Sequence, residues 1–351
     1  MFSCEEPHGT RERSKPRGYN KPPKACPTTS PRQRAPGKEC PAHSPVALKC
    51  ASTCFCCIFT DRSPRTMSCC RVFCLLFLSL PAFGQSVQSM APQVVEFASG
   101  KLRLKAYFWK PAGTGLFPAV LFNHGSGGDD ADHTANMPIT QAADVLAPFF
   151  VKHGYAFLYP FRRGQGPSAS QAPFMQEVLR REEESKGKGA RQHLQFVLLT
   201  TEQLDDVMAA LAFLKTMPGI DPRRIAVAGH SFGGQLTLLA AGSDKTIRGA
   251  VTFAAAAGSW DHSPELRERL TGAIRNTNAA IMLTHAENDF ATTAGRALAE
   301  ELNRLHKPFV LKIYPQVGLT PEDGHGMLYE NIPAWESDVF EFLDQHVKQQ
   351  H

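Results

Sequence analysis

Apolar and polar positions follow two different periods along most of this chain. The segment Phe117–Asn123 reads FPAVLFN, a continuous apolar run that is typical of a strand buried on both faces of a sheet. The segment Thr201–Met217 places its apolar residues in steps of three and four, which predicts an amphipathic helix. The same patterns predict further strands at 94–97, 102–110, 155–161, 224–229, 248–256, 279–285 and 308–314, and further helices at 140–153, 232–242, 264–275, 292–306 and 333–347. This order predicts an α/β fold, with a mostly parallel sheet covered by helices on both faces.

One insertion, residues 165–200, interrupts this rhythm. It combines a loop of small residues, a helix-like stretch at 174–184 and the segment SKGKGA, whose glycines and charges indicate a flexible loop. The helix-like stretch has an apolar face that includes Phe174 and Leu179. We therefore expect the insertion to form a cap over the functional pocket.

Charge and cysteine content divide the chain near residue 84. Residues 1–84 contain 13 Lys and Arg against 5 Asp and Glu, whereas residues 85–351 contain 25 against 28. The basic surplus therefore belongs to the N-terminal segment, and we expect no nucleic-acid surface on the folded part. All ten cysteines precede residue 75, so the folded part has no thiolate ligand for zinc and no disulfide.

The segment at 67–84 has the three parts of a secretory signal peptide. It reads MSCCRVFCLLFLSLPAFG, with Arg71 in its first part, then an apolar run, then small residues at its end. The apolar run of 12 residues is too short to cross the ~30 Å core of a bilayer as a helix, so we expect no stable membrane anchor. We predict that translation starts at Met67, that residues 1–66 are a spurious or disordered extension, and that residues 85–351 form a secreted or periplasmic domain.

A sharp turn that carries a serine joins the predicted strand at 224–229 to the helix at 232–242. Residues 229–233 read GHSFG, a G-x-S-x-G motif in the strand–turn–helix context that a nucleophile elbow requires. The two glycines let the backbone pass closely through the turn, so that the Ser231 hydroxyl projects above the sheet. The N-terminus of the following helix directs free N–H groups to the same place. The motif therefore predicts a nucleophilic serine.

A serine nucleophile needs a base, and the base needs a carboxylate that orients it. After such an elbow the acid and then the histidine follow in the chain, each just beyond a sheet strand. The strand at 279–285 leads to Asp289, and the next strand leads to a loop that contains His325. We assign Asp289 as the acid and His325 as the base, with Glu287 and Asp323 as the alternative acids.

The loop after the first apolar strand supplies the other half of the predicted machinery. Residues 124–128 read HGSGG, and such small residues let backbone N–H groups approach a substrate oxygen. We expect the N–H of Ser126 and the N–H of Phe232, the residue after the nucleophile, to form an oxyanion hole.

These motifs, taken in order, resemble the α/β-hydrolase superfamily, and in particular its dienelactone hydrolase and prolyl-oligopeptidase-like groups. The motifs are HGSGG at 124–128, YPFRRGQG at 159–166, DPRRIAVAGHSFGG at 221–234, H-A-x-x-D at 285–289 and GHG at 324–326. The resemblance covers about Val94 to His346 and implies an α/β-hydrolase fold with a Ser-His-Asp triad. Dienelactone hydrolases proper use a cysteine nucleophile where this chain has Ser231, so their substrate is not carried over. Prolyl oligopeptidases carry a propeller domain that the few residues between 85 and 117 cannot form.

Two charged features admit a binding role. Arg162 could pair with a substrate carboxylate through two parallel hydrogen bonds, whereas the resemblance also allows a structural contact with loop carbonyls. The run Asp129–His133 could hold a cation through oxygen ligands, but we expect a solvated acidic loop.

The predicted function is a serine hydrolase that cleaves small carboxylic esters or lactones through an acyl-enzyme, without metal or organic cofactor. Two alternatives stay open at this point. One is a serine peptidase that acts on short peptides, and the other is a non-catalytic binding protein on the same fold. The expected partner is a small ester or a short peptide.

Overall fold

The computed structural model describes residues 91–127 and 137–349. All of them belong to the second of two compact units of the chain, Pro81–His351. The predicted N-terminal extension and signal peptide, together with the acidic run 129–133, lie outside the described residues. Within the described ranges, no helix combines the length and apolar character that a membrane crossing requires.

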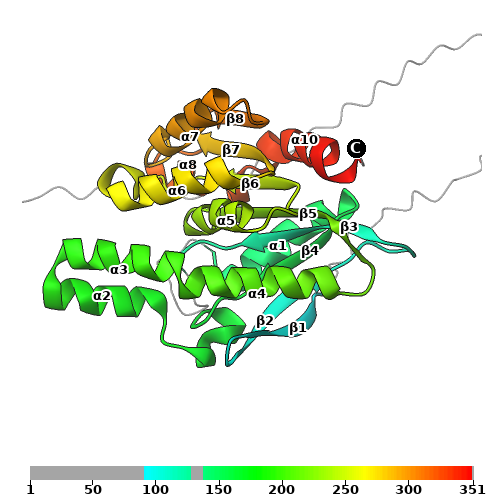
Figure 1. Cartoon of the computed structure of the whole chain (residues 1–351), viewed down its shortest axis with the longest axis horizontal. Helices are drawn as coiled ribbons and strands as arrows, with labels where there is room; N and C mark the ends of the chain where they lie inside the picture. Colours follow the sequence, from blue (N-terminus) through cyan, green and yellow to red (C-terminus); the bar gives the residue numbers. More distant parts are fainter. Residues whose placement is uncertain (1–90, 128–136, 350–351) are drawn as a thin grey trace, which may run out of the picture. The chain divides into compact units, whose positions relative to one another are not determined.

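Eight strands form one sheet, in the order β1-β2-β4-β3-β5-β6-β7-β8. Their bounds are Gln93–Ser99 (β1), Leu102–Trp109 (β2), Phe117–Asn123 (β3), Ala156–Pro160 (β4), Ile220–His230 (β5), Gly249–Phe253 (β6), Ala280–Ala286 (β7) and Phe309–Tyr314 (β8). The hairpin β1–β2 pairs antiparallel with β4, and every later pair in the order is parallel. The predicted α/β-hydrolase fold, with its mostly parallel sheet, is confirmed (Figure 1).

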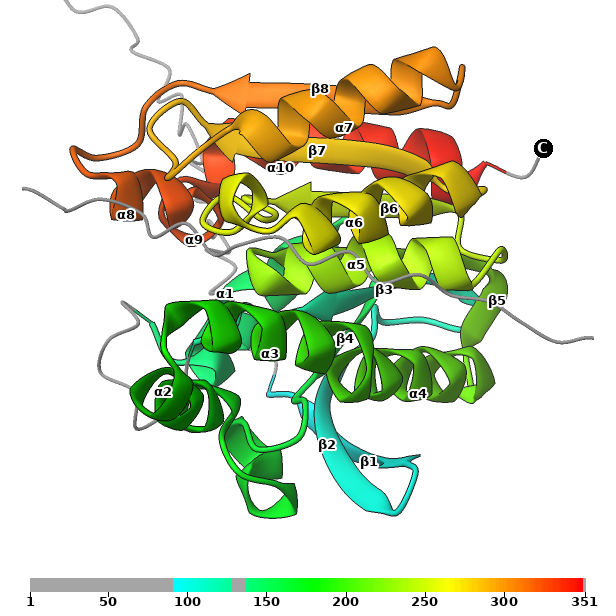
Figure 2. The same ribbon diagram turned by 60° about the vertical axis from the view of Figure 1, so that its left-hand side comes forward.

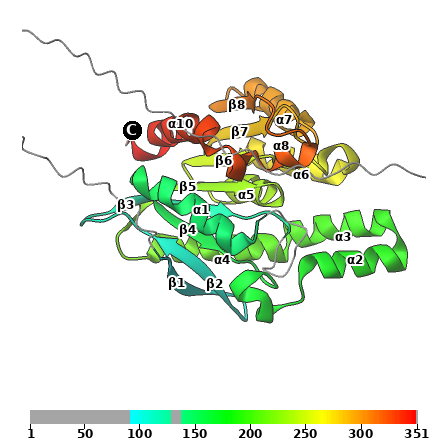
Figure 3. The ribbon, with the colours of Figure 1, turned by 180° about the vertical axis from the view of Figure 1, so that it is seen from behind.

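Helices cover both faces of this sheet. Their bounds are Ile139–Lys152 (α1), Met175–Lys186 (α2), Lys188–Thr200 (α3), Glu202–Thr216 (α4), Phe232–Ser243 (α5), Pro264–Asn276 (α6), Thr293–Arg304 (α7), Pro321–His325 (α8), Met327–Glu330 (α9) and Ile332–Leu343 (α10). Helices α4, α5, α6 and α7 lie on one face, and α1 and α10 lie on the other, as the opposite views of Figures 1 and 3 show.

The central strands supply apolar side chains to two separate cores, one on each face. On β3, Ala119 and Leu121 join the core beneath α4 and α5, whereas Val120 and Phe122 join the core beneath α1 and α10. Successive side chains of a strand point to opposite faces, so a strand covered on both sides must be apolar throughout. This explains the unbroken apolar run from which β3 was predicted.

The insertion at 165–200 agrees with the prediction in part. The helix predicted at 174–184 is present as α2, but a second helix that was not predicted, α3, runs antiparallel to it and lies beside it in Figures 1 and 3. The segment SKGKGA is not a flexible loop, because its residues continue the two helices and only Gly187 separates them. Gly187 has a φ of 87°, a conformation that glycine adopts without a steric penalty, so one residue suffices to reverse the chain.

Candidate active site

The turn between β5 and α5 holds Ser231 in an unusual backbone conformation. Its φ is 55° and its ψ is −117°, a region that residues with a side chain rarely occupy. Gly229 and Gly233 make this turn possible: a Cβ on Gly229 would overlap the carbonyl of Gly233, and a Cβ on Gly233 would overlap the carbonyl of Asn123. The predicted elbow is therefore present, with Ser231 immediately before the first turn of α5.

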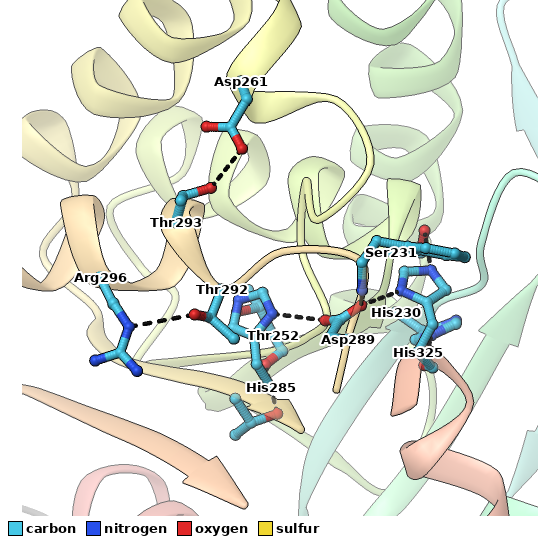
Figure 4. Close-up of polar contacts among 12 residues, drawn as sticks. His230, Ser231, Thr252, Asp261, His285, Asp289, Thr292, Thr293, Arg296 and His325 are labelled. Atoms are coloured by element: carbon cyan, nitrogen blue, oxygen red, sulfur yellow. Dashed lines mark hydrogen bonds and ion pairs between the residues drawn. The ribbon is translucent and has the colours of Figure 1, made fainter. Parts of the chain in front are cut away.

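Of the three predicted triad residues, His325 lies within hydrogen-bonding distance of both Ser231 and Asp289. His325 Nε2 is 2.9 Å from Ser231 Oγ, and His325 Nδ1 is 2.8 Å from Asp289 Oδ1. Asp289 follows β7, and His325 ends the short helix α8, which lies beyond the carboxyl ends of the strands in Figure 2. Figure 4 shows the three side chains close to one another. In this order a proton can pass from the serine hydroxyl to an imidazole that a carboxylate orients.

Neither alternative acid is available to His325. The Glu287 side chain is exposed to solvent. Asp323 caps the start of α8, where its Oδ2 accepts hydrogen bonds from the N–H of Leu319 at 2.8 Å and of Thr320 at 2.9 Å. The cap explains why His325 lies on a helix and not in the predicted loop, since a capping box stabilises a short helical turn.

The Asp289 carboxylate is buried and strongly hydrogen-bonded. Burial alone would raise its pKa, but the hydrogen bonds from His285 and His325 outweigh burial and lower the pKa of Asp289 to about 2. A third donor, the N–H of Phe290, lies 2.8 Å from Oδ1. Asp289 is therefore ionised at neutral pH and can orient His325 and stabilise its protonated form.

The predicted oxyanion donors come from two different elements, the loop after β3 and the start of α5. Ser126 belongs to the loop after β3, and the N–H of Phe232 begins α5. Within residues 91–127 and 137–349, neither N–H donates to a protein acceptor. Gly125, Ser126 and Gly127 line the cavity in front of Ser231, so this loop meets any ligand that reaches the serine.

Arg162 does not face the cavity, which corrects its predicted contact with a substrate carboxylate. Its side chain is only 1% exposed. Nη1 donates to the carbonyl of His124 at 2.9 Å, and Nη2 donates to the carbonyl of Gly125 at 2.7 Å. Nε donates to Gln203 Oε1 on α4 at 2.9 Å. Arg162 therefore braces the backbone of the oxyanion loop from behind, with its donors directed away from any substrate.

A cavity of about 360 Å³ opens in front of Ser231. Most of its wall is apolar, formed by Met137, Ile139, Ala142, Phe290 and Tyr329. The charged acidic groups on the wall are two exposed carboxylates, Glu322 and Glu330, and no Lys or Arg of the described residues joins them. None of these wall residues was predicted from the sequence. Four of them belong to α8, α9 or the turn after β7. The positions of these short segments are set by tertiary contacts, so the sequence pattern did not reveal that they line a cavity.

The insertion at 165–200 borders the cavity but does not cover it. No described residue of the insertion lines the cavity wall. The insertion contacts the loop that lines the cavity, because Gln165 and Gln176 donate to the carbonyl of Ser126 at 3.4 and 3.2 Å. The apolar face of α2, including Leu179, is buried in the core beneath α4. Gln165 and Gln176 thus connect the insertion to the loop after β3, and no described residue of the insertion forms part of the cavity wall, where a cap was predicted.

Two buried histidines beside the site should make the fold sensitive to acid. Burial and the neighbouring His325 lower the pKa of His230 to about 3, and burial together with Arg162 lowers the pKa of His124 well below 6.5. Between pH 6.5 and 3 the unfolded chain binds a proton at His230 and the folded protein does not, and His124 acts in the same direction below pH 6.5, so stability falls as the pH falls. We expect His230→Gln to reduce the loss of unfolding free energy between pH 7 and pH 5 by about 2 kcal/mol.

Urea unfolding at the two pH values measures this difference. His262, which is exposed to solvent, provides the control, because His262→Gln should leave the pH dependence unchanged. A His230→Gln protein that loses as much stability on acidification as the wild type would contradict the assignment.

The chain matches known proteins over most of the described region. The profile of the dienelactone hydrolase family matches residues 106–328. The quorum-quenching protein AidA of Acinetobacter baumannii is 29% identical over 171 residues, which cover 48% of this chain and 46% of AidA. The chain thus spans about half the length of this curated relative.

Solved structures share the fold at low sequence identity. The acylaminoacyl peptidase of Pyrococcus horikoshii is similar with a TM-score of 0.55 and 18% identity, over 76% of this chain and 43% of the peptidase. A dienelactone hydrolase from Anabaena variabilis is similar with a TM-score of 0.50 and 18% identity, over 74% of this chain and 100% of that structure. The family profile covers more than half of the chain and includes Ser231, Asp289 and His325, and the chain therefore belongs to the dienelactone hydrolase family.

Proposed function

We propose that this protein is a serine hydrolase that cleaves small carboxylic esters or lactones through an acyl-enzyme. The observation that carries the proposal is the hydrogen-bonded row from Ser231 Oγ through His325 to Asp289, at the base of an open cavity. Three groups in this relation suit acyl transfer, because the base and the nucleophile already touch and the acid holds the base in one tautomer.

In the proposed reaction, Ser231 Oγ forms a bond to the substrate carbonyl carbon while its proton moves to His325 Nε2. The carbonyl oxygen becomes an oxyanion, which accepts hydrogen bonds from the N–H groups of Ser126 and Phe232. The bond to the leaving alcohol then breaks, and His325 returns the proton to the alcohol oxygen. Water repeats the sequence on the acyl-enzyme, with His325 as base, and releases the acid. Asp289 stays ionised throughout.

The cavity wall supports a substrate that is small and carries no negative charge. A volume of about 360 Å³ with a mostly apolar wall fits a short acyl or alkyl group. A substrate carboxylate would lie near Glu322 and Glu330, and like charges repel. Screening by water limits this repulsion at exposed groups, so we expect selection by charge to be moderate.

A panel of p-nitrophenyl esters, a simple lactone and short peptide amides tests the proposal. We expect kcat/KM to be higher for a neutral butyrate ester than for the succinate half-ester, which is similar in length and carries a carboxylate, by about 10-fold. Glu330→Gln should bring the kcat/KM values of the two esters closer together, because it removes one of the two charges that repel the succinate carboxylate. Glu300→Gln, on the exposed side of α7, is the matched control and should leave the ratio unchanged.

A second measurement separates the reaction class from the substrate class. A fluorophosphonate probe should label the wild-type protein and fail to label Ser231→Ala. Labelling of Ser231 combined with cleavage of peptide amides and not esters would contradict the ester proposal and favour the peptidase alternative. Absence of labelling in the folded wild-type protein would contradict the serine mechanism itself.

A further inference from the structure

A second histidine contacts the triad acid from the side away from the cavity. His285, near the end of β7, is 1% exposed, and its Nδ1 lies 2.7 Å from Asp289 Oδ2. Figure 4 shows the His285 imidazole on one side of Asp289 and the His325 imidazole on the other. His285 does not line the cavity, so it has no direct access to a substrate.

The chemistry of the contact fixes the proton on His285. The ionised carboxylate of Asp289 can only accept hydrogen bonds, so Nδ1 of His285 must carry its proton and donate it. Oδ1 accepts from His325 Nδ1 at 2.8 Å and from the N–H of Phe290 at 2.8 Å. His285 is thus the donor that holds Oδ2. Donors on both oxygens fix the plane of the carboxylate as well as its position.

The His285 ring is itself confined by α7. Gly295 packs against the ring edge, and a Cβ at Gly295 would lie 2.8 Å from both Cδ2 and Nε2 of His285. A heavy atom at that distance would force the ring or the helix to move. The imidazole therefore fits in its present position only because residue 295 is a glycine. Any larger residue at position 295 would collide with the ring.

We infer that His285 is a positioning residue, which holds the Asp289 carboxylate in the plane that orients His325 for the reaction proposed above. The expected effects on kcat rest on the proposed function. The hydrogen bonds to Asp289 are present in the protein whether or not it turns over a substrate. If the donor on Oδ2 is removed, a buried carboxylate oxygen has no partner. The carboxylate must then rotate toward another donor or take up a proton, and in either case His325 loses its alignment.

Two substitutions separate the hydrogen bond from the volume of the ring. His285→Leu removes the donor and keeps an apolar side chain, whereas His285→Asn places an amide N–H near the position of Nδ1. We expect His285→Leu to lower kcat by about 10- to 100-fold with KM changed less than about 2-fold, because a supporting contact is lost and the cavity is intact. We expect His285→Asn to recover most of the loss.

A spectroscopic measurement tests the same contact without substrate. The proton between His325 Nδ1 and Asp289 should give a resolved low-field proton NMR resonance in the wild type, which Asp289→Asn removes. We expect this resonance to shift or broaden in His285→Leu and to persist in His285→Asn. Because it needs no turnover, it tests the positioning role even if the ester proposal fails on the substrate panel.

A pair of glycine substitutions tests the inference without changing His285. Gly295→Ala should displace the imidazole and lower kcat in the same way as His285→Leu. Gly272→Ala in α6 is the matched control, since a Cβ there would meet nothing within 4 Å, and kcat should stay at the wild-type value. If His285→Leu does not fold, the comparison of Gly295→Ala with Gly272→Ala still tests whether His285 positions Asp289.

Two results would overturn the inference. One is a folded His285→Leu protein with wild-type kcat and an unchanged low-field resonance. The other is full activity of Gly295→Ala while His285→Leu and His285→Asn are equally impaired, which would indicate that the ring serves packing alone.

Discussion

Replacing Ser231 by alanine is expected to lower kcat for a neutral ester by at least about 10⁴-fold, without unfolding the protein. Ser231→Ala removes the attacking oxygen but keeps the Cβ and the backbone conformation of the elbow. The residual rate comes from the oxyanion donors and the cavity, which the substitution does not touch. Steady-state kinetics on a p-nitrophenyl ester measures the loss, and circular dichroism establishes that the fold is kept.

The same measurement on the double variant tests whether the triad acts as a unit. Once Ser231 is absent, His325 has no hydroxyl proton to accept, so adding His325→Ala to Ser231→Ala should lower kcat little further. Ester hydrolysis that survives Ser231→Ala, or losses that multiply in the double variant, would contradict the acyl-enzyme mechanism.

Substitution of Arg162 should have the largest effect on stability. Arg162→Met leaves two buried acceptors without their donor, namely the carbonyl of His124 and the side-chain oxygen of Gln203, and it removes one donor from the partly buried carbonyl of Gly125. We expect the unfolding free energy to fall by about 3 kcal/mol or more, because each unpaired buried acceptor is costly. The released loop carries the N–H of Ser126, so kcat should fall as well, by about 10²-fold.

Substrate charge distinguishes this bracing role from substrate binding. If Arg162 braces the loop, Arg162→Met lowers kcat equally for neutral and carboxylate-bearing esters. If KM of Arg162→Met rose only for carboxylate-bearing esters, the result would instead support a direct contact between Arg162 and the substrate carboxylate. Arg181→Met, at a side chain 72% exposed on α2, is the control and should change stability by less than about 0.5 kcal/mol.

The geometry of the candidate site was predictable from the sequence where local chemistry determines it. The elbow was predictable because its three parts are consecutive in the sequence: a buried strand, a G-x-S-x-G turn and an apolar helix. All three parts are needed to form the elbow. Asp289 and His325 were predictable from chain order, since each follows a parallel strand and parallel strands end at one edge of the sheet. The family resemblance rested on the same residues.

The remaining features depend on contacts between residues that are distant in sequence. Arg162 was placed correctly at a strand end, but its direction depends on Gln203 and on the carbonyls of the oxyanion loop, 37 to 41 residues away. Helix α3 was missed because two glycines stand at its start and only Leu199 among its residues is fully buried. Its stability comes from packing against α2 and α4, which no local pattern reveals.

The placement of the proposed triad on three separate strand connections also affects how the protein folds. Ser231 follows β5, Asp289 follows β7, and His325 follows the edge strand β8, 94 residues beyond the serine. A nucleophile activated in this way cannot exist in a collapsed chain whose last strand has not yet docked. Contacts of such long sequence separation form late, because the loop between them must first be closed. The rate at which a refolding sample regains reactivity toward a serine-directed probe therefore reports completion of the parallel sheet, and not the collapse that precedes it.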